Sequence, residues 1–419
     1  MQQTPAQSAV PDQTATTHRD ILIISFVAWT LTNMDQAFFG YAIPGILAEF
    51  GLPLEAVGAV LTVSFVFSSV LLLFAGTAAD RFGRGPMLSL YLATSALFVG
   101  LQGVAGGIVL LTIFRSLGFG FSNGLSPITN AYVAENVAPR YRGLAMGVLQ
   151  CGYPLGWFIA SIFAVRLLSD YGWRAMCFAA FLVIPVAGVF YWLLRDAPDV
   201  PPAEKQTSDD GSFRVLFSPE HRRNSLASIV TYFAFGGAYA GTAFFFPTFF
   251  AQVRGYTPAE AAGLVGLSNG IGIVGYLLAA VVGEYLLTRR TVFVLWALGG
   301  AIALAGLMWL PDSRAEDTFW YALTAALFYG SLAVLPVLIA EIFPQSVRAS
   351  ALSICASAPL SLGFAVFPLA VPFVVANVGW EMGFTLVICP LLVVATLSAL
   401  FLPNRPSGLA MAAEKDRAL

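Results

Sequence analysis

The chain has 419 residues, of which 58% are hydrophobic and only 11% are charged, and its formal net charge is −2. Soluble domains carry about 25% charged residues, so this chain has too few charges to cover a water-facing surface and is expected to use lipid as its solvent. Its scattered Lys and Arg residues do not form the basic patch of a nucleic-acid-binding protein. The composition predicts an integral membrane protein and excludes nucleic-acid binding and a soluble enzyme.

Twelve segments of the chain are long and apolar enough to cross a bilayer, which takes about 20 mostly apolar residues per helix. They cover residues 21–48, 55–79, 86–105, 107–134, 144–168, 174–194, 224–252, 259–287, 291–310, 318–342, 350–376 and 382–402. An even number of crossings places both termini on one side. We therefore expect an all-α, multi-pass membrane protein.

Positive charge is distributed unequally between the two sides of the membrane. The side that holds the termini carries 16 of the 21 Lys and Arg residues, the other side carries 4, and Arg115 lies within a span. An excess of Lys and Arg marks cytoplasmic loops. The bias predicts a protein of the cell inner (plasma) membrane with both termini in the cytoplasm.

A polar interval at residues 195–221 divides the spans into two groups of six and has the composition of a flexible cytoplasmic linker. The predicted organisation is an N-terminal cytoplasmic tail (1–20), an N-terminal six-helix bundle (21–194), the linker (195–221), a C-terminal six-helix bundle (222–402) and a C-terminal cytoplasmic tail (403–419).

The two groups of spans repeat one another at an offset that drifts only from 203 to 207 residues. The matching positions are His18-Arg19 with His221-Arg222, Tyr41–Pro44 with Phe244–Pro247, Glu55–Gly58 with Glu260–Gly263, Glu135 and Arg142 with Glu341 and Arg348, and Gly172-Trp173 with Gly379-Trp380. Each match alone is weak, but five in order indicate a duplication. Two halves in the same orientation are typical of a transporter whose substrate lies between them, and a static duplicated scaffold is the alternative.

A charged turn joins the second and third spans, with the sequence Gly76-Thr-Ala-Ala-Asp80-Arg81-Phe-Gly83-Arg84-Gly85. It resembles the G-x-x-x-D-R-x-G-R-R signature of the major facilitator superfamily, with Gly85 in place of the last Arg. The resemblance covers the whole chain, because twelve spans, a central cytoplasmic linker and a half repeat all belong to that family's pattern. It implies two pseudo-symmetric six-helix bundles that transport by alternating access.

Clusters of acids and arginines also follow the fourth and tenth spans. The resemblance implies that these loops and the charged turn lock the cytoplasmic gate, through Gly76, Asp80, Arg81, Gly83, Arg84, Glu135, Arg142, Glu341 and Arg348. The alternative is a set of solvated loops whose arginines only reflect the positive-inside bias. The turn between the eighth and ninth spans, Gly283-Glu-Tyr-Leu-Leu-Thr-Arg289-Arg290, has lost the acid at the equivalent place.

Two charges lie inside the predicted membrane segments, Asp35 in the first span and Arg115 in the fourth. A charge at bilayer depth costs at least about 2.5 kcal/mol and therefore faces the protein interior for a reason. Arginine can hold a substrate carboxylate with two parallel hydrogen bonds, and Asp35 can take a proton when Arg115 is so occupied. Proton and anion would then load together. The alternative is a permanent Asp35–Arg115 ion pair that only fixes helix packing.

The stretch Thr32-Asn33-Met-Asp35-Gln36 resembles the first-span patch of organic-anion symporters, including aromatic-acid:proton symporters. Gln36 stands where related anion:cation symporters often place Arg, and a second acid is absent from the fourth span, so one coupling acid and one proton per cycle are expected. The repeat carries Asp35 onto Ala238 and Arg115 onto Tyr321, so the C-terminal half lacks both charges. The candidate substrate-binding residues are Arg115, Asn33, Gln36, Asn123, Tyr153, Tyr232, Tyr239, Asn269 and Tyr329.

Antiporters of this family carry a GP-rich stretch in the fifth span. Here Gly147-Val-Leu-Gln150-Cys-Gly152-Tyr153-Pro154-Leu-Gly156 keeps the glycines but breaks the GP-GG core, which disfavours a drug antiporter.

The expected function is proton-coupled uptake of a small organic acid anion, such as an aromatic or a sugar acid. A proton-driven exporter of drugs or metabolites and a non-transporting membrane sensor are the alternatives. The sequence has no nucleophile–base set, and Cys151, Cys177, Cys355 and Cys389 all fall in apolar runs without metal-ligand spacing. We expect no enzyme activity, cofactor or metal, and a monomer whose partners are the organic anion, protons and the lipid bilayer.

Overall fold

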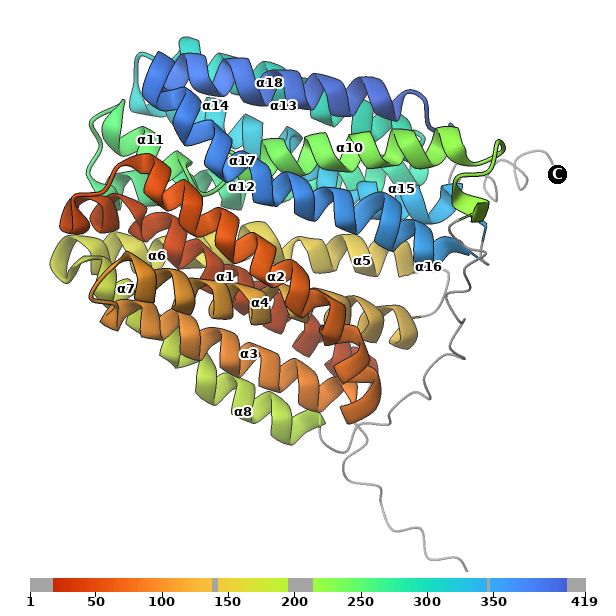
Figure 1. Ribbon diagram of the computed structural model, residues 1–419, viewed down its shortest axis with the longest axis horizontal. Coiled ribbons are helices and arrows are strands. Elements are labelled where there is room, and N and C mark those ends of the chain that lie inside the picture. The colour runs from red at the N-terminus through yellow and green to blue at the C-terminus, as the bar shows by residue number, and fades with distance from the viewer. Residues whose placement is uncertain (1–17, 138–141, 195–213, 345–346, 405–419) are drawn as a thin grey trace, which may run out of the picture.

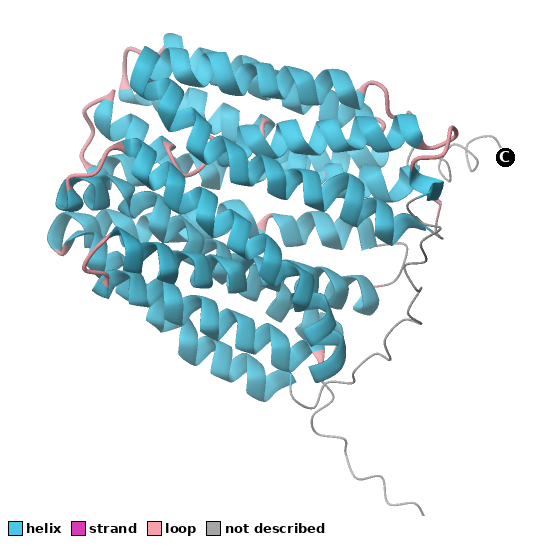
Figure 2. Ribbon diagram, viewed as in Figure 1, coloured by secondary structure: helices cyan, strands magenta, loops and turns pink. Residues whose placement is uncertain are grey.

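The computed structural model describes residues 18–137, 142–194, 214–344 and 347–404. The described residues form helices and connections without a β-strand (Figure 2). The predicted C-terminal tail from residue 405, most of the predicted linker and nearly all of the N-terminal tail lie outside the described residues.

The N-terminal half confirms the six spans predicted before residue 194. Its helices are α1 (His18–Phe50), α2 (Leu54–Phe82), α3 (Arg84–Leu101), α4 (Ile108–Asn136), α5 (Arg142–Gln150), α6 (Gly152–Asp170), α7 (Gly172–Ala179) and α8 (Val183–Leu194). The fifth span is divided at Cys151 into α5 and α6, and a short 3₁₀ turn at Ala180–Leu182 joins α7 to α8.

The C-terminal half contains helices at the other six predicted spans. Its helices are α10 (Arg222–Ala240), α11 (Phe246–Gln252), α12 (Pro258–Tyr285), α13 (Arg289–Trp309), α14 (Arg314–Leu327), α15 (Leu335–Ile342), α16 (Arg348–Ala351), α17 (Ala358–Val378) and α18 (Trp380–Ala399). A π-helical stretch, Leu352–Ser357, joins α16 to α17.

Among the described residues, 11 stretches are long and apolar enough to span a membrane as helices. The remaining predicted segment, 224–252, is not one continuous helix, because turns at residues 241–245 separate α10 from α11. Pro247 lies in the first turn of α11, where its missing N–H and fixed φ fit, whereas in the interior of a continuous helix it would break a hydrogen bond.

The two halves lie against each other as two bundles, the N-terminal one in red to yellow-green and the C-terminal one in green to blue (Figure 1). Helix α2 packs against α17, and α6 packs against α12. Glycine makes these approaches close: a Cβ at Gly58 would lie 2.3 Å from the carbonyl oxygen of Pro368, and one at Gly266 would lie 1.8 Å from Oγ of Ser161. We call the end where α1 begins and α18 ends the terminal face, and both contacts lie toward the opposite face.

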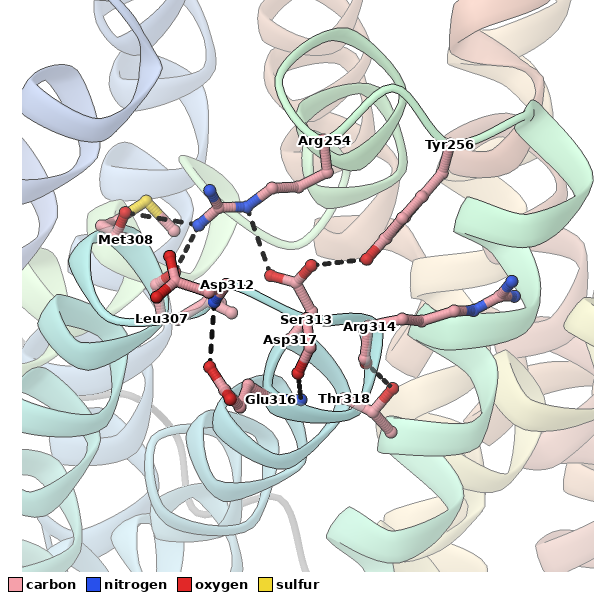
Figure 3. A network of polar contacts seen from close by, with 10 residues as sticks. All are labelled: Arg254, Tyr256, Leu307, Met308, Asp312, Ser313, Arg314, Glu316, Asp317 and Thr318. Carbon is pink, nitrogen blue, oxygen red and sulfur yellow. Dashed lines mark hydrogen bonds and ion pairs between the residues drawn. The ribbon is translucent and has the colours of Figure 1, made fainter.

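A polar network fixes two connections at the opposite face of the C-terminal half (Figure 3). The buried Asp317 carboxylate lies 3.2 Å from Nε of Arg254 and accepts a hydrogen bond of 2.7 Å from the Tyr256 hydroxyl. Arg254 also donates to the carbonyl oxygen of Leu307 at 3.2 Å. Burial and the bond to Asp317 raise the pKa of Tyr256 to about 12. The network holds the α11–α12 connection against the α13–α14 turn.

Contacts at the opposite face also confirm the internal repeat. The indole of Trp173 donates to Glu49 at 2.6 Å, and the indole of Trp380 donates to Gln252 at 3.1 Å. Trp173 and Trp380 are equivalent in the repeat, as are Glu49 and Gln252. Each half therefore ties its first span to its sixth with the same indole bond.

We predict that Gly58→Ala lowers the thermal stability of the detergent-purified protein, by about 1–3 kcal/mol, because the added methyl group overlaps the Pro368 carbonyl and overpacks the contact between the halves. Gly188→Ala is the matched control, since a Cβ there meets nothing within 4 Å. An unchanged melting temperature for Gly58→Ala would contradict the close packing of α2 on α17.

Candidate functional site

The guanidinium of Arg115 lies in the centre of the protein and has no hydrogen-bond acceptor. The side chain is fully buried, and Nε and both terminal nitrogens are without partners. Three aromatic rings surround it, with the Cζ atom 4.4 Å from the ring centroid of Phe39, 4.8 Å from that of Phe119 and 5.4 Å from that of Phe244. Cation–π contacts stabilise the charge but leave all five N–H donors unused.

Asp35 lies on the face of α1 that packs against α4. On this face Thr32 and Gln36 both reach Ser122, the Gln36 amide donating to its hydroxyl at 2.7 Å. The ring of Phe39, one helical turn beyond Asp35, packs against the guanidinium of Arg115. Asp35 thus stands between Thr32 and Gln36 along this face, near the middle of the 33-residue helix α1.

Asp35 and Arg115 do not form an ion pair in this structure. Asp35 is fully buried, and neither of its carboxylate oxygens has a hydrogen-bond partner. The alternative in which the two charges form a permanent structural pair is therefore wrong for this conformation. Both polar groups are buried without a hydrogen-bond partner.

Aromatic side chains from both halves continue from Arg115 along the contact between the bundles. Phe244, in the break between α10 and α11, lies 5.8 Å from Trp157 of α6. Tyr153 of α6 lies 5.5 Å from Tyr239 of α10, and Tyr239 lies 5.0 Å from Tyr329. These distances join ring centroids. The rings connect the arginine of one half to the tyrosines of the other.

The structure brings together some of the predicted substrate-binding residues and not others. Tyr153, Tyr239 and Tyr329 are in contact, and Gln36 lies on the Asp35 face of α1. Tyr232 is buried but lies two turns of α10 away from Tyr239, outside these ring contacts.

Three predicted amides have other partners. Asn33 and Asn269 donate to carbonyls of their own helices, those of Trp29 and Val265. Asn123 donates to Ser68 of α2.

Sequence reasoning missed Phe244, Trp157 and Tyr276. The Trp157 indole N–H and the Tyr276 hydroxyl are buried without partners. In sequence they look like the many aromatic residues that fill membrane bundles or face lipid. For Phe244 a signal existed, since it lies three residues before Pro247, which stands in the first turn of α11.

The predicted gate residues lie at the terminal face, where two equivalent ion pairs form. Arg84 pairs with Glu135, and Arg289 pairs with Glu341. The repeat relates Arg84 to Arg289 and Glu135 to Glu341. Each of the two acids thus pairs with an arginine of a turn, Arg84 or Arg289.

The structure describes the side chains of only some of the remaining gate residues. The side chains of Asp80, Arg142 and Arg348 lie outside the described residues. Gly76 lies within α2, and Arg81 is exposed with its guanidinium 5.3 Å from the Phe82 ring centroid.

Two positions of the charged turn require glycine for different structural reasons. Gly83, which ends α2, has φ +89°, a conformation that favours glycine. A Cβ at Gly85 would lie 2.9 Å from the carbonyl oxygen of Leu194. The close packing of α3 on the end of α8 therefore accounts for the departure from the arginine of the family signature.

The turn between α12 and α13 carries an acid one residue before the position equivalent to Asp80. Arg289 pairs with this acid, Glu284, as well as with Glu341.

A family model described as Major Facilitator Superfamily matches residues 21–336, three quarters of the chain. The chain belongs to the Major Facilitator Superfamily. This facilitator is similar over 95% of its length to a solved bacterial homologue of the human lysosomal transporter Spinster in an inward-facing, unoccupied conformation. The TM-score is 0.70, the sequence identity is 17% and 97% of the solved chain is covered, which supports the fold alone.

Curated relatives of the facilitator are named as transporters. The cis,cis-muconate transport protein of Acinetobacter baylyi is 24% identical over 91% of this chain and 94% of its own. The probable 4-methylmuconolactone transporter of Cupriavidus pinatubonensis is 25% identical, with 81% and 79% covered, and the gallate transporter of Pseudomonas putida is 25% identical, with 70% and 72% covered. The facilitator is a multi-pass membrane transporter and not an enzyme.

We predict that Arg289→Gln destabilises the facilitator by about 1–3 kcal/mol, because it leaves the carboxylates of Glu284 and Glu341 without their shared cation. Combining it with Glu284→Gln and Glu341→Gln should restore most of the loss in a thermal unfolding measurement. Arg290→Gln is the matched control, since Arg290 donates to the backbone carbonyls of Leu400 and Leu402. Equal losses for the two single variants would contradict the shared ion pair.

Proposed function

We propose that the facilitator takes up a small organic acid anion together with a proton, by alternating access. The observation that carries this proposal is the Arg115 guanidinium, which is buried at the contact between the halves without any acceptor. A charge in this position is costly unless a ligand uses it. The proposal treats Arg115 as the anchor for a substrate carboxylate.

Arginine suits this role because its planar fork donates two parallel hydrogen bonds to a carboxylate. The rings of Phe39, Phe119 and Phe244 would exclude water around the pair and strengthen it. Phe244 comes from the C-terminal half, whereas the other two rings and Arg115 come from the N-terminal half. Rocking of one half against the other would therefore cover and uncover the anion.

Proton coupling is assigned to Asp35. An anion held by Arg115 adds negative charge about one helical turn from this carboxyl group, and a nearby like charge favours the protonated form. In return, protonation of Asp35 removes the repulsion between its carboxylate and the bound anion. The anion and the proton would then bind cooperatively and cross the membrane together, with one proton per cycle.

The relatives support a carboxylate substrate, because they are named for muconate, gallate and a methylmuconolactone. We also propose that the protein lies in the inner (plasma) membrane with both termini in the cytoplasm, because 16 Lys and Arg residues lie on the side of the termini and 4 on the other. The terminal face, with its Arg84–Glu135 and Arg289–Glu341 pairs, would then be the cytoplasmic gate.

We predict that an aromatic or sugar carboxylate raises the melting temperature of the wild type and that Arg115→Met weakens this binding at least about tenfold, the loss of a charge-assisted bond pair. Arg166→Met, which removes an exposed arginine of α6, should bind like the wild type. Stabilisation of the wild type and Arg115→Met to the same extent by neutral or cationic compounds would contradict the anion anchor.

For Asp35, we predict that proteoliposomes containing Asp35→Asn exchange labelled acid for unlabelled acid but no longer accumulate it when a proton gradient is imposed, because the amide cannot carry the proton. The wild type should accumulate the acid on the side to which protons flow. Gradient-driven accumulation by Asp35→Asn would refute the coupling role, and gradient-driven expulsion by the wild type would identify an exporter.

A further inference from the structure

Three buried hydrogen-bond donors lie apart from Arg115 and have no partners. They are the indole N–H of Trp157, 2% exposed, and the hydroxyls of Tyr239 and Tyr276, 5% and 1% exposed. Trp157 belongs to α6, Tyr239 to α10 and Tyr276 to α12. We call these residues the donor trio. A buried donor without an acceptor costs about 1–3 kcal/mol, so three in one region call for an explanation.

The donor trio gathers around Tyr153. The Tyr153 ring centroid lies 6.2 Å from that of Trp157 and 5.5 Å from that of Tyr239. The Tyr153 hydroxyl lies beside the Trp157 indole and the Tyr239 hydroxyl, but neither donor meets hydrogen-bond geometry. Tyr276 of α12 lies near Tyr153 and Tyr239. Both halves therefore contribute side chains of the donor trio to one region.

The donor trio is suited to an uncharged acceptor. An indole N–H only donates, so the group that satisfies it must accept. Among the described residues, the fully or largely buried arginines are Arg115 and Arg289, and Arg289 is engaged with Glu284 and Glu341 at the terminal face. A second carboxylate at the donor trio would remain a buried charge without a counter-ion. A hydroxyl or carbonyl oxygen carries no such cost.

The ring of Phe244 lies between the donor trio and Arg115, and its plane is tilted by 57° from that of Trp157. Phe244 lies 5.4 Å from the Arg115 Cζ atom and 5.8 Å from the Trp157 ring centroid. A compact, planar body can lie along these rings with a polar group at each end. We propose that the donor trio forms a second polar subsite, and that the substrate is a planar monocarboxylate with an uncharged hydrogen-bond acceptor at the end opposite its carboxylate. This inference rests on the proposed role of Arg115 and adds a specificity determinant to it.

The test compares three probes on the purified full-length protein by isothermal titration: 4-hydroxybenzoate, the isosteric 4-methylbenzoate and the dianion terephthalate. One added hydrogen bond should make 4-hydroxybenzoate bind about three- to tenfold more tightly than 4-methylbenzoate. Terephthalate should bind no better than 4-methylbenzoate. Trp157→Phe and Tyr276→Phe each remove one donor and retain an aromatic ring, and each should bring the hydroxy-to-methyl ratio toward one.

Tyr91→Phe is the matched control, since Tyr91 is a largely buried tyrosine of α3 whose ring lies 5.3 Å from that of Phe121, away from the donor trio. It should keep the wild-type ratio. If all three acids bind through Arg115 but the ratio is one in the wild type, or is unchanged in both Trp157→Phe and Tyr276→Phe, the second subsite is refuted and the anion anchor stands. If none of the acids binds the wild type, or Arg115→Met binds them equally well, the anchor and the subsite both fail.

Discussion

The central constraint on this protein is the burial of an arginine that its own fold does not satisfy. Arg115 contacts three phenylalanine rings, while its nitrogen atoms lack acceptors and the Asp35 carboxylate does not pair with it. Burying such a charge in a membrane bundle is expensive. The rest of the structure makes that burial tolerable, through the close packing of α1 on α4 and through the ring that the C-terminal half adds at Phe244.

The two halves share a scaffold but differ at its centre. Their ends repeat each other in detail, with the indole bonds of Trp173 and Trp380 at one face and the ion pairs of Arg84 and Arg289 at the other. In the middle, the N-terminal half carries the charges, whereas the C-terminal half supplies aromatic rings and hydroxyls. Duplication thus explains the ends, where both halves form equivalent contacts, and divergence at the centre is what the proposed site for a ligand with a charged and an uncharged end requires.

Much of the fold follows from the sequence, because apolar stretches of about 20 residues are a strong signal and a charge among them is conspicuous. Asp35 and Arg115 were visible for that reason. Contact partners were not, since hydropathy says nothing about which helix ends meet, and the pairing of Glu135 with Arg84 needed the three-dimensional structure. Trp157 and Tyr276 could not be singled out among 8 Trp and 14 Tyr residues. The break at 241–245 is concealed in the sequence because its two phenylalanines continue the apolar run.

The most direct test of the anion anchor is a crystal structure with bound 4-bromobenzoate, in which anomalous scattering locates the bromine and so fixes the direction of the ligand. The account predicts the carboxylate at the Arg115 guanidinium, with oxygen–nitrogen distances of about 2.7–2.9 Å, and the bromine directed along the rings of Phe244 and Trp157. A ligand bound elsewhere, with Arg115 still enclosed by its three phenylalanines and without an acceptor, would contradict it.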